Sequence, residues 1–434
     1  MTEKVDVVIV GAGLAGLGAA YHLAGAGAEV LVVERGDYAG SKNVTGGRLY
    51  LNPVRSFYPD LFGKEAQTTA PFERTVVKER LTVLADKGGA SLELLGPSFA
   101  EAPPHSVTLL RGVFDRWLAE QAIARGALVV PGYKVDDLTR EAGKVVGVVA
   151  AGDEVRADVV VAADGALSFI AERAGLRGRH DPGHFALGIK EVIELPSERI
   201  EERLGLAPGE GLSALYFGRI THGLVGGGFL YTNRQSLSVG LVIGMASLVE
   251  HGPGIEASAL IDEFTSRPEV ARLLSGGNVV EYSAHAIPEG SKRAMPRLVA
   301  DGLLIVGDAA GLALNMGISV RGMDFALASG AMAAHAILEA KADGDFSATS
   351  LGRFEAAMRS NFVLQDHKTF ASMPGFLENP RLYELYPQTL MNLLVALFYV
   401  DESPKASLWK TSLAALRTLP IGQALGDLWR MRRL

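Results

Sequence analysis

The 434-residue chain contains no cysteine. This absence excludes a disulfide bond within the chain, and it excludes an iron–sulfur cluster or another metal held by cysteine thiolates. Histidine offers no clear substitute. His180 and His184 are four residues apart, but Pro182 and Gly183 between them disfavour the helix that would align two imidazoles. We therefore expect no metal site in this chain.

Long hydrophobic runs are also lacking. No apolar stretch reaches the roughly 18 residues that a membrane-spanning helix needs. The early run at residues 5–10 leads into a glycine-rich turn, which is typical of a strand and not of a signal peptide. The net charge of −7 makes nucleic acid an unexpected partner. With 48% hydrophobic and 21% charged residues, the composition indicates a globular chain long enough for two or three domains.

A dinucleotide-binding pattern opens the chain. The valine-rich residues 5–10 predict a buried parallel strand. Gly11, Gly13 and Gly16 then match G-x-G-x-x-G, and helical spacing and a second strand follow, which ends at Glu34. In this pattern the first glycine allows a tight turn, the second lets a pyrophosphate approach the backbone, and the third lets the helix pack closely. Glu34 is placed to accept hydrogen bonds from a ribose, so we favour a dinucleotide site over an unliganded turn.

The loop after Glu34 (residues 35–48) is rich in glycine and carries Arg35, Lys42 and Arg48. It is either a solvated surface loop or a flexible segment that wraps a large cofactor, with Lys42 and Asn43 as polar contacts. We favour the second interpretation, because the glycines lie beside a site that is already predicted.

Two further aspartates follow predicted buried strands. Asp164 comes after the second strand of a predicted hairpin (residues 145–151 and 154–161), and Asp308 comes after the apolar run at residues 302–307. An Asp-Gly turn at such a strand end can direct a carboxylate toward a ligand, although alone it is an ordinary turn. Arg111, at the start of a predicted helix, either meets a cofactor phosphate or lies in solvent, and the sequence leaves both open.

Residues 185–285 differ in character from the rest. Strand-like runs separated by turns rich in proline and glycine predict a mostly antiparallel sheet inserted into the first domain. Within it, Gly226, Gly227 and Gly228 indicate a bulge or a ligand against bare backbone. The predicted fold class is α/β. A Rossmann-type cofactor-binding domain comprises residues 1–74, 106–184 and 286–345, a substrate domain comprises residues 75–105 and 185–285, and a helical docking region comprises residues 346–434.

The helical C-terminal region shows no nucleotide pattern. Residues 390–400 include one polar residue, which predicts either a core helix or a helix lying in a membrane interface. Residues 401–434 hold six basic and three acidic residues in a chain that is acidic as a whole. This combination fits contact with anionic lipid, and it equally fits an ordinary packed helix with a solvated tail. The sequence leaves open whether the region touches lipid or another subunit.

The three nucleotide signatures together resemble the FAD-binding, two-domain flavoproteins of the glutathione-reductase-like superfamily. A narrower resemblance is to the electron transfer flavoprotein–quinone oxidoreductase family, and most closely to its FixC-type members. It extends over nearly the whole chain and rests on the motifs Ser41-Lys42-Asn43-Val44-Thr45-Gly46-Gly47, Leu187-Gly188-Ile189-Lys190-Glu191, Gly227-Gly228-Phe229-Leu230-Tyr231, Glu281-Tyr282-Ser283-Ala284-His285, Ile287-Pro288-Glu289-Gly290 and Arg321-Gly322-Met323-Asp324.

The resemblance implies FAD as the cofactor and a quinone-binding inserted domain. Because the flavin performs the chemistry, no residue is expected to act as a catalytic acid or nucleophile. The resemblance places the quinone near Gly226 and Gly227. The FAD-binding positions that it implies, together with those predicted from the motifs, are Gly11, Gly13, Leu14, Ala15, Gly16, Glu34, Arg35, Lys42, Asn43, Gly47, Arg111, Val135, Ala163, Asp164, Gly165, Gly307, Asp308, Gly317 and Ile318.

The missing cysteines bear on the partners. Mitochondrial-type members of the family bind a [4Fe–4S] cluster through four cysteines, whereas this chain is similar to the FixC type, in which a separate small ferredoxin-like subunit supplies the cluster. The resemblance further implies an electron transfer flavoprotein α/β pair as donor, in a FixABCX-like complex of the kind that bifurcates electrons from NADH. It implies a quinone as acceptor and a cytoplasmic protein peripheral on the inner face of the cell membrane. Three alternatives stay open: a geranylgeranyl-reductase-like isoprenoid reductase, a flavin-dependent aromatic hydroxylase and a flavin-carrying assembly subunit.

Overall fold

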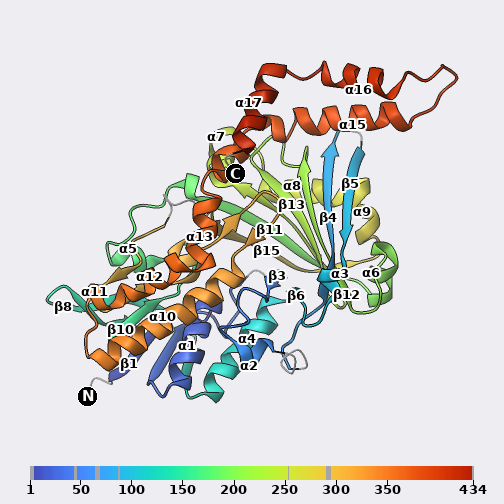
Figure 1. The fold of residues 1–434 in the computed structure, drawn as a ribbon. Helices are drawn as coiled ribbons and strands as arrows, with labels where there is room; N and C mark the ends of the chain where they lie inside the picture. The colour runs from blue at the N-terminus through green and yellow to red at the C-terminus, as the bar shows by residue number, and fades with distance from the viewer. Residues whose placement is uncertain are drawn as a thin grey trace.

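Two large β-sheets organise the molecule, and helices pack against both (Figure 1). The structure is a computed structural model that describes residues 4–43, 46–63, 69–86, 88–252, 254–289 and 295–432. The N-terminal helices lie at one end of the molecule, and a group of C-terminal helices projects from the other end (Figure 1).

The first sheet has a parallel core made of valine-rich strands that are buried on both faces, as parallel sheets require. Its order is β16-β17-β10-β1-β2-β7, with β16 antiparallel, and the antiparallel strands β9 and β8 extend it beside β10. The predicted hairpin at residues 145–161 is confirmed as β9 and β10. The bounds are β1 (Lys4–Val10), β2 (Val30–Glu34), β7 (Leu128–Pro131), β8 (Val135–Glu141), β9 (Lys144–Ala150), β10 (Asp153–Ala162), β16 (Val299–Ala300) and β17 (Leu303–Ile305).

The second sheet has the order β15-β11-β14-β13-β12-β4-β6-β3, with β5 beside β4. It is mostly antiparallel, as predicted, except that β12 and β4 run parallel. Its strands β3 and β6 come from segments that the sequence analysis assigned to the cofactor domain. The bounds are β3 (Gly47–Tyr50), β4 (Thr75–Ala85), β5 (Gly88–Leu95), β6 (Ser106–Leu109), β11 (Phe185–Glu194), β12 (Glu210–Gly218), β13 (Gly226–Thr232), β14 (Ser236–Gly244) and β15 (Asn278–Pro288). A separate small ladder pairs β18 (Leu314–Asn315) with β19 (Val320–Arg321).

Helices cover the sheets around two hydrophobic cores. In the first core, α10 packs so tightly on α1 that a Cβ at Gly330 would collide with the carbonyl oxygen of Ala15, which explains the alanine and glycine content of α10. The second core lies between the second sheet and α6, α8 and α9. The bounds are α1 (Leu14–Gly25), α2 (Pro59–Phe62), α3 (Pro97–Ala100), α4 (Arg111–Ala124), α5 (Phe169–Arg173), α6 (Ser197–Leu204), α7 (Met245–His251), α8 (Ala257–Ser266), α9 (Pro268–Leu274), α10 (Met323–Asp343), α11 (Ala348–Leu351), α12 (Arg353–Ser360), α13 (Phe362–Thr369) and α14 (Met373–Leu377).

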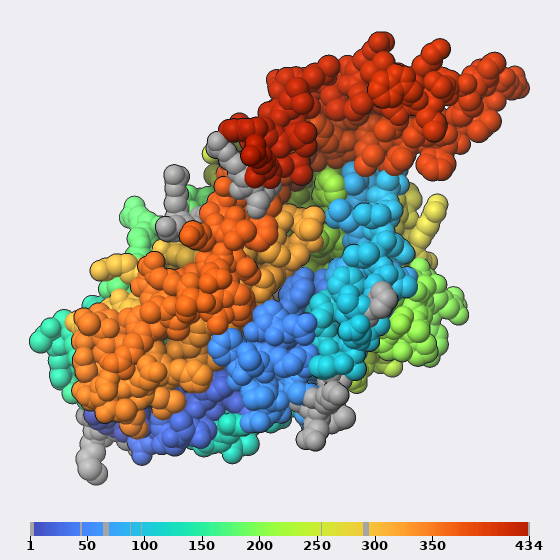
Figure 2. Space-filling model, in the orientation of Figure 1, coloured from blue at the N-terminus to red at the C-terminus, as the bar shows by residue number. Residues whose placement is uncertain are grey.

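The last three helices form an arm that projects from the body, which we call the C-terminal arm: α15 (Leu385–Phe398), α16 (Leu408–Leu416) and α17 (Ile421–Met431) (Figures 1 and 2). Residues 390–400 are therefore helical to Phe398, but a core helix is the wrong interpretation, because only Pro387 and Thr389 of α15 are buried. A partly buried ion pair between Arg381 and Asp427 ties α17 back to the body, with both distances at 2.8 Å. Within the described ranges, no helix is long and apolar enough to cross a membrane.

Candidate cofactor site

The glycine-rich turn between β1 and α1 has the geometry that its sequence predicts. Gly11 has a φ of 105°, and a Cβ there would collide with the carbonyl oxygen of Ala163 at the end of β10. A Cβ at Gly16 would collide with the carbonyl oxygen of Gly11, so both glycines are required for the fold. Gly13 is different, because a Cβ there would meet no protein atom within 4 Å. The turn therefore leaves free space directly above Gly13 and the start of α1.

Glu34 lies at the end of β2, beside this turn. Its two carboxylate oxygens accept backbone hydrogen bonds from Ala12 at 2.8 Å and from Gly36 at 2.7 Å. These bonds fix the carboxylate against the glycine turn. The backbone carbonyl of Glu34 also accepts from Tyr133, which brings the loop before the buried Val135 to the same place. The predicted ribose-binding residue and Val135 are thus close to the turn.

Arg111 is not free in solvent. At the start of α4 its guanidinium donates two hydrogen bonds of 2.8 Å to the fully buried Asp115. Burial alone would lower the pKa of Arg111, but Asp115 and, more weakly, Asp308 outweigh it and raise that pKa. Asn43 also donates to Asp115, which anchors the end of the glycine-rich loop on α4. Lys42 is exposed, and Val44 and Thr45 lie outside the described residues.

Asp164 plays a different part from the one expected for its side chain. Its carboxylate accepts from Ser168 Oγ at 2.6 Å and from the backbone N–H of Ile170 at 3.0 Å, so both of its oxygens accept hydrogen bonds at the start of α5, where Ser168 is the N-cap residue. The next residue, Gly165, has a φ of 86° with open space around it. Both carboxylate oxygens of Asp164 are therefore engaged locally, and the backbone at Gly165 has open space beside it.

Asp308 lies in a single 3₁₀ turn, η3 (Gly307–Ala310), directly after β17. Gly307 has a φ of 60°, and its N–H donates to Ser329 Oγ on α10 at 3.0 Å. Burial raises the pKa of Asp308, and the nearby Arg111 opposes that rise. Gly317 and Ile318 are exposed between β18 and β19, just before α10. The carboxyl ends of β1, β10 and β17 thus converge, as neighbouring parallel strands must.

Comparisons with known proteins place the chain in a family. Family sequence models match as "FAD dependent oxidoreductase" at residues 6–90, "ETF-QO, ubiquinone-binding" at residues 185–287 and "ETF-QO/FixC family C-terminal domain" at residues 373–434. Protein FixC of Salmonella typhimurium is 42% identical over 414 residues, which cover 95% of each chain. The chain belongs to the ETF-QO/FixC family. A second relative is the probable electron transfer flavoprotein-quinone oxidoreductase YdiS of Escherichia coli. It is 40% identical over an alignment that covers 98% of this chain and 97% of YdiS.

Solved structures resemble this ETF-QO/FixC family member in fold alone. A geranylgeranyl bacteriochlorophyll reductase-like protein from Thermoplasma acidophilum has a TM-score of 0.72 at 22% identity and covers 99% of this chain and 100% of its own. The flavin-dependent brominase Bmp2 has a TM-score of 0.64 at 18% identity and covers 95% and 98%. These likenesses confirm the predicted Rossmann-type FAD-binding architecture. This protein is an FAD-dependent oxidoreductase that acts in electron transfer.

The residues at the strand ends fit FAD. The free space above Gly13 and the unpaired N–H groups at the start of α1 suit a pyrophosphate. The carboxylate of Glu34 suits the adenosine ribose, and the half-buried Asp308 follows β17 in the same sheet.

The two glycines implied for quinone contact lie at the start of β13. A Cβ at Gly226 would collide with the carbonyl oxygen of Val242, and one at Gly227 would lie 3.0 Å from the carbonyl oxygen of Tyr216. The buried Tyr383, from the C-terminal region, also reaches this place. Burial raises the pKa of its phenol, and a backbone hydrogen bond with Gly226 opposes that rise.

Lys190 and His285 lie in the family motifs but are not among the site residues predicted from the sequence. Lys190, on β11, is buried and donates from Nζ to the carbonyl oxygen of Gly46 at 2.6 Å. A lysine preceded by the apolar residues 185–189 of the strand is the signal that could have identified it, because lysine is seldom buried without a partner.

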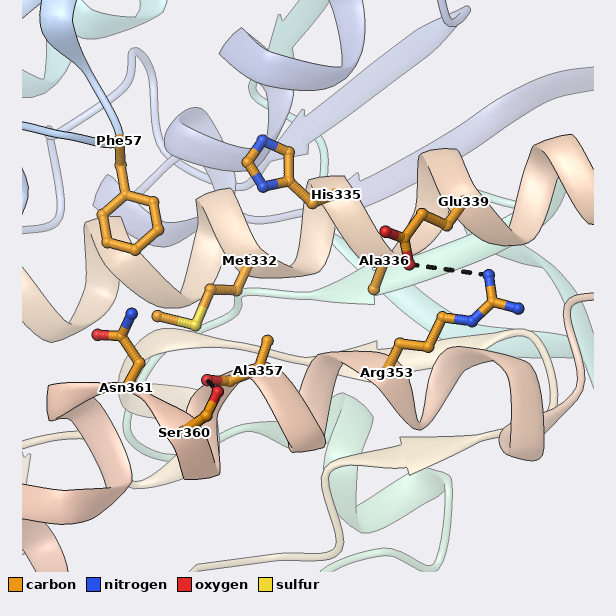
Figure 3. Close-up of a pocket in the computed structure, with 9 residues that line it drawn as sticks. All are labelled: Phe57, Met332, His335, Ala336, Glu339, Arg353, Ala357, Ser360 and Asn361. Atoms are coloured by element: carbon orange, nitrogen blue, oxygen red, sulfur yellow. Dashed lines mark hydrogen bonds and ion pairs between the residues drawn. The ribbon is translucent and has the colours of Figure 1, made fainter.

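A groove on the outer side of α10 is separate from this site. Figure 3 shows the side chains of α10 and α12 that face one another across it, including the ion pair of Glu339 and Arg353 at 3.8 Å. None of its lining residues is a predicted cofactor or quinone position.

Proposed function

We propose that the chain passes electrons from a reduced electron transfer flavoprotein to a quinone through its FAD. Bound FAD accepts electrons singly or in pairs, so it joins a one-electron donor to a two-electron acceptor. The carrying observation is the match of the ubiquinone-binding family model to residues 185–287, within a chain about 40% identical to FixC and YdiS along its length. Turnover of a quinone with reduced electron transfer flavoprotein tests the proposal, and NADPH oxidation stimulated by an aromatic acid would instead support a hydroxylase.

We assign the binding work to residues that the fold brings together. The FAD site comprises the glycine turn, Glu34, Arg111 and the turns at Ala163–Gly165 and Gly307–Asp308. Arg111 is held by Asp115 with its charge intact, so it offers a fixed cation near the cofactor. Gly226 and Gly227, at the start of β13, are the proposed quinone contacts, and the buried Tyr383 lies beside Gly226 from the C-terminal side.

The proposed partners are an electron transfer flavoprotein α/β pair and a small ferredoxin-like subunit, in a FixABCX-like complex that bifurcates electrons from NADH. The absence of cysteine supports a separate iron–sulfur subunit, because this chain has no thiolate to hold a cluster. Affinity purification from the native cell, followed by mass spectrometry and iron analysis, tests the composition. Recovery of the chain alone, at native expression level and low salt, would contradict it.

We propose that the C-terminal arm contacts the inner face of the cell membrane. Its exposed side chains are largely apolar: Phe398 is 79% exposed, Leu408 74% and Trp409 75%, and Ile421 and Leu428 exceed 60%. Soluble surfaces seldom gather so many large apolar groups in one place. The arm also projects away from the body, so it can reach a flat surface without obstruction (Figure 2). Basic side chains on the same segment add attraction to anionic lipid.

The structure selects the substitutions that test this membrane contact. Leu393 and Leu397 are partly buried, so replacing them would also weaken packing. Phe398, Leu408 and Trp409 are the better choice for serine replacement. Complete burial of one such side chain in the membrane contributes about 1.5–3 kcal/mol to the free energy of membrane binding.

Vesicle flotation with phosphatidylglycerol-containing vesicles is the measurement. The three serines should reduce the partition coefficient by at least about a hundredfold, since two of the three side chains together account for about 3 kcal/mol. The matched control replaces Val113, Ile123 and Leu128, which are at least half exposed. Val113 and Ile123 belong to α4, which lies at the other end of the molecule from the arm (Figure 1). If the arm variant floats like the parent while it loses partner subunits, the arm is a protein-docking surface and the membrane contact is wrong.

A further inference from the structure

Lys190 lies where the second sheet meets the proposed FAD-binding loop. The side chain is 5% exposed, and its Nζ donates to the carbonyl oxygen of Gly46 at 2.6 Å. Gly46 directly precedes Gly47 and packs so closely on the sheet that a Cβ there would collide with Ser238 on β14. The ammonium is thus held between the cofactor loop and the sheet, and not at the outer surface.

Charged or titratable groups act on Lys190 from two neighbouring elements, β15 and α4. On β15, Ser283 pairs with Lys190 in the strand register, so Glu281 and His285, two residues to either side, share its face of the sheet. On α4, Arg111 acts electrostatically on both Lys190 and His285. On β14, the neighbours are the uncharged Ser238 and Gly240.

Arg111 disfavours the ammonium form of Lys190 although Asp115 pairs with that arginine, Glu281 favours the ammonium form, and burial disfavours it most. Burial, with help from Arg111, lowers the pKa of Lys190 to about 7, against a smaller opposing effect of Glu281. Burial also lowers the pKa of His285, and Arg111, Lys190 and Arg35 lower it further. A negative charge added nearby would therefore favour the ammonium form of Lys190 strongly.

We propose that Lys190 is a redox-linked proton carrier: its ε-amine takes up one proton from water when the bound FAD is reduced, and it returns that proton when the FAD is reoxidised. One N–H bond forms on reduction and breaks on reoxidation. The electrons come from the reductant of the oxidoreductase reaction and stay on the cofactor. The inference rests on the proposed FAD site, but it does not depend on the identity of the donor or the acceptor.

The pH dependence follows from linkage. Below the pKa of about 7, Lys190 is an ammonium in both redox states, and no extra proton is taken up. Above it, the amine of the oxidised protein becomes an ammonium on reduction, so the midpoint potential falls more steeply with pH. One additional proton per two electrons changes the equilibrium constant for reduction tenfold per pH unit. For a two-electron couple this change adds about 30 mV per pH unit to the slope of the midpoint potential.

Spectroelectrochemical titration of the purified holoprotein between about pH 6 and 9 tests the proposal without donor or quinone. Lys190→Met should retain FAD and lose the steeper segment above pH 7. Lys78→Met is the matched control, because Lys78 is also a buried lysine of the second sheet, but it donates to the carbonyl oxygens of Leu204 and Gly205, both at 2.8 Å, at the end of α6. The control should keep the parent slope.

Lys190→Arg is a second variant, for use if the Lys190→Met protein does not retain FAD. Arginine keeps the charge and the donor for Gly46 but does not titrate in this range, so this variant should bind FAD and also lack the steeper segment. If Lys190→Met or Lys190→Arg holds FAD and reproduces the parent curve, the proton is carried elsewhere and the proposal is wrong.

Discussion

Replacing Gly13 by valine should remove FAD binding while leaving the fold almost unchanged. Gly13 precedes α1 with φ −87° and ψ −179°, an extended conformation that valine adopts readily. Its Cβ would meet no protein atom within 4 Å, so nothing in the chain is displaced. The space that it would occupy is the space through which a pyrophosphate approaches the start of α1.

The magnitudes separate binding from folding. Glycine at this helix N-cap makes no side-chain bond, so valine should cost the apo protein about 1 kcal/mol or less. In the parent, FAD at 100 times its Kd stabilises the fold by about 2.7 kcal/mol. The variant should lose that increment, so added FAD should no longer raise its Tm. Differential scanning fluorimetry with and without FAD, beside isothermal titration, measures both quantities.

Two comparisons sharpen this experiment. Gly178→Val introduces a side chain at an exposed glycine that also has no atom within 4 Å, and it should behave like the parent. Gly16→Ala should instead lower the stability of the apo protein, because its Cβ would collide with the backbone of Gly11. FAD binding by Gly13→Val at the parent affinity would refute the assignment of this turn to the pyrophosphate.

Further predictions concern the cofactor, the donor and the C-terminal arm. Acid denaturation should release all of the FAD, since the sequence places no cysteine or obvious histidine for a covalent link; flavin left in the pellet would contradict this. NADH alone should reduce the bound FAD slowly, because the sequence contains one strand–glycine turn–helix unit and FAD fills it; fast bleaching in stopped flow without a partner would count against it. Arg381 holds the pKa of Asp427 well below its ordinary value of 3.8. The pair should therefore stabilise the docking of α17 above about pH 4 and lose that effect as the pH falls further, and Asp427→Asn should abolish this pH dependence in hydrogen exchange of α17.

The glycine turn could be predicted in detail because its requirements are local. Gly11 and Gly16 are required by backbone atoms close by, Gly13 leaves space that no protein atom fills, and Glu34 ends β2 at a fixed spacing from the turn. Asp164 was harder, because a carboxylate after a strand can serve a ligand or cap the next helix. Ser168 and Ile170 provide the partners that decide for the cap, and their position depends on where α5 begins.

Properties that depend on tertiary contacts were predicted less well. The helix that begins at Arg111 is confirmed as α4, but its sequence does not tell that Val113 is 51% exposed whereas the neighbouring Phe114 is fully buried. The apolar composition of α15 did not reveal that it lies in an exposed arm. Burial of a helix depends on which elements cover it, and the local sequence does not contain that information. The role of Lys190 likewise required the contact with Gly46, which is distant in the chain.

The central claim is that electrons pass from an electron transfer flavoprotein through FAD to a quinone. The most direct test mixes the FAD-loaded protein with the chemically reduced electron transfer flavoprotein pair of the same organism in a stopped-flow instrument, and then adds a short-chain ubiquinone or menaquinone. The account predicts rapid bleaching of the FAD by the donor, followed by reoxidation with one quinone reduced per two electrons. A donor that leaves the FAD oxidised, or a reduced FAD that no quinone reoxidises, would contradict it.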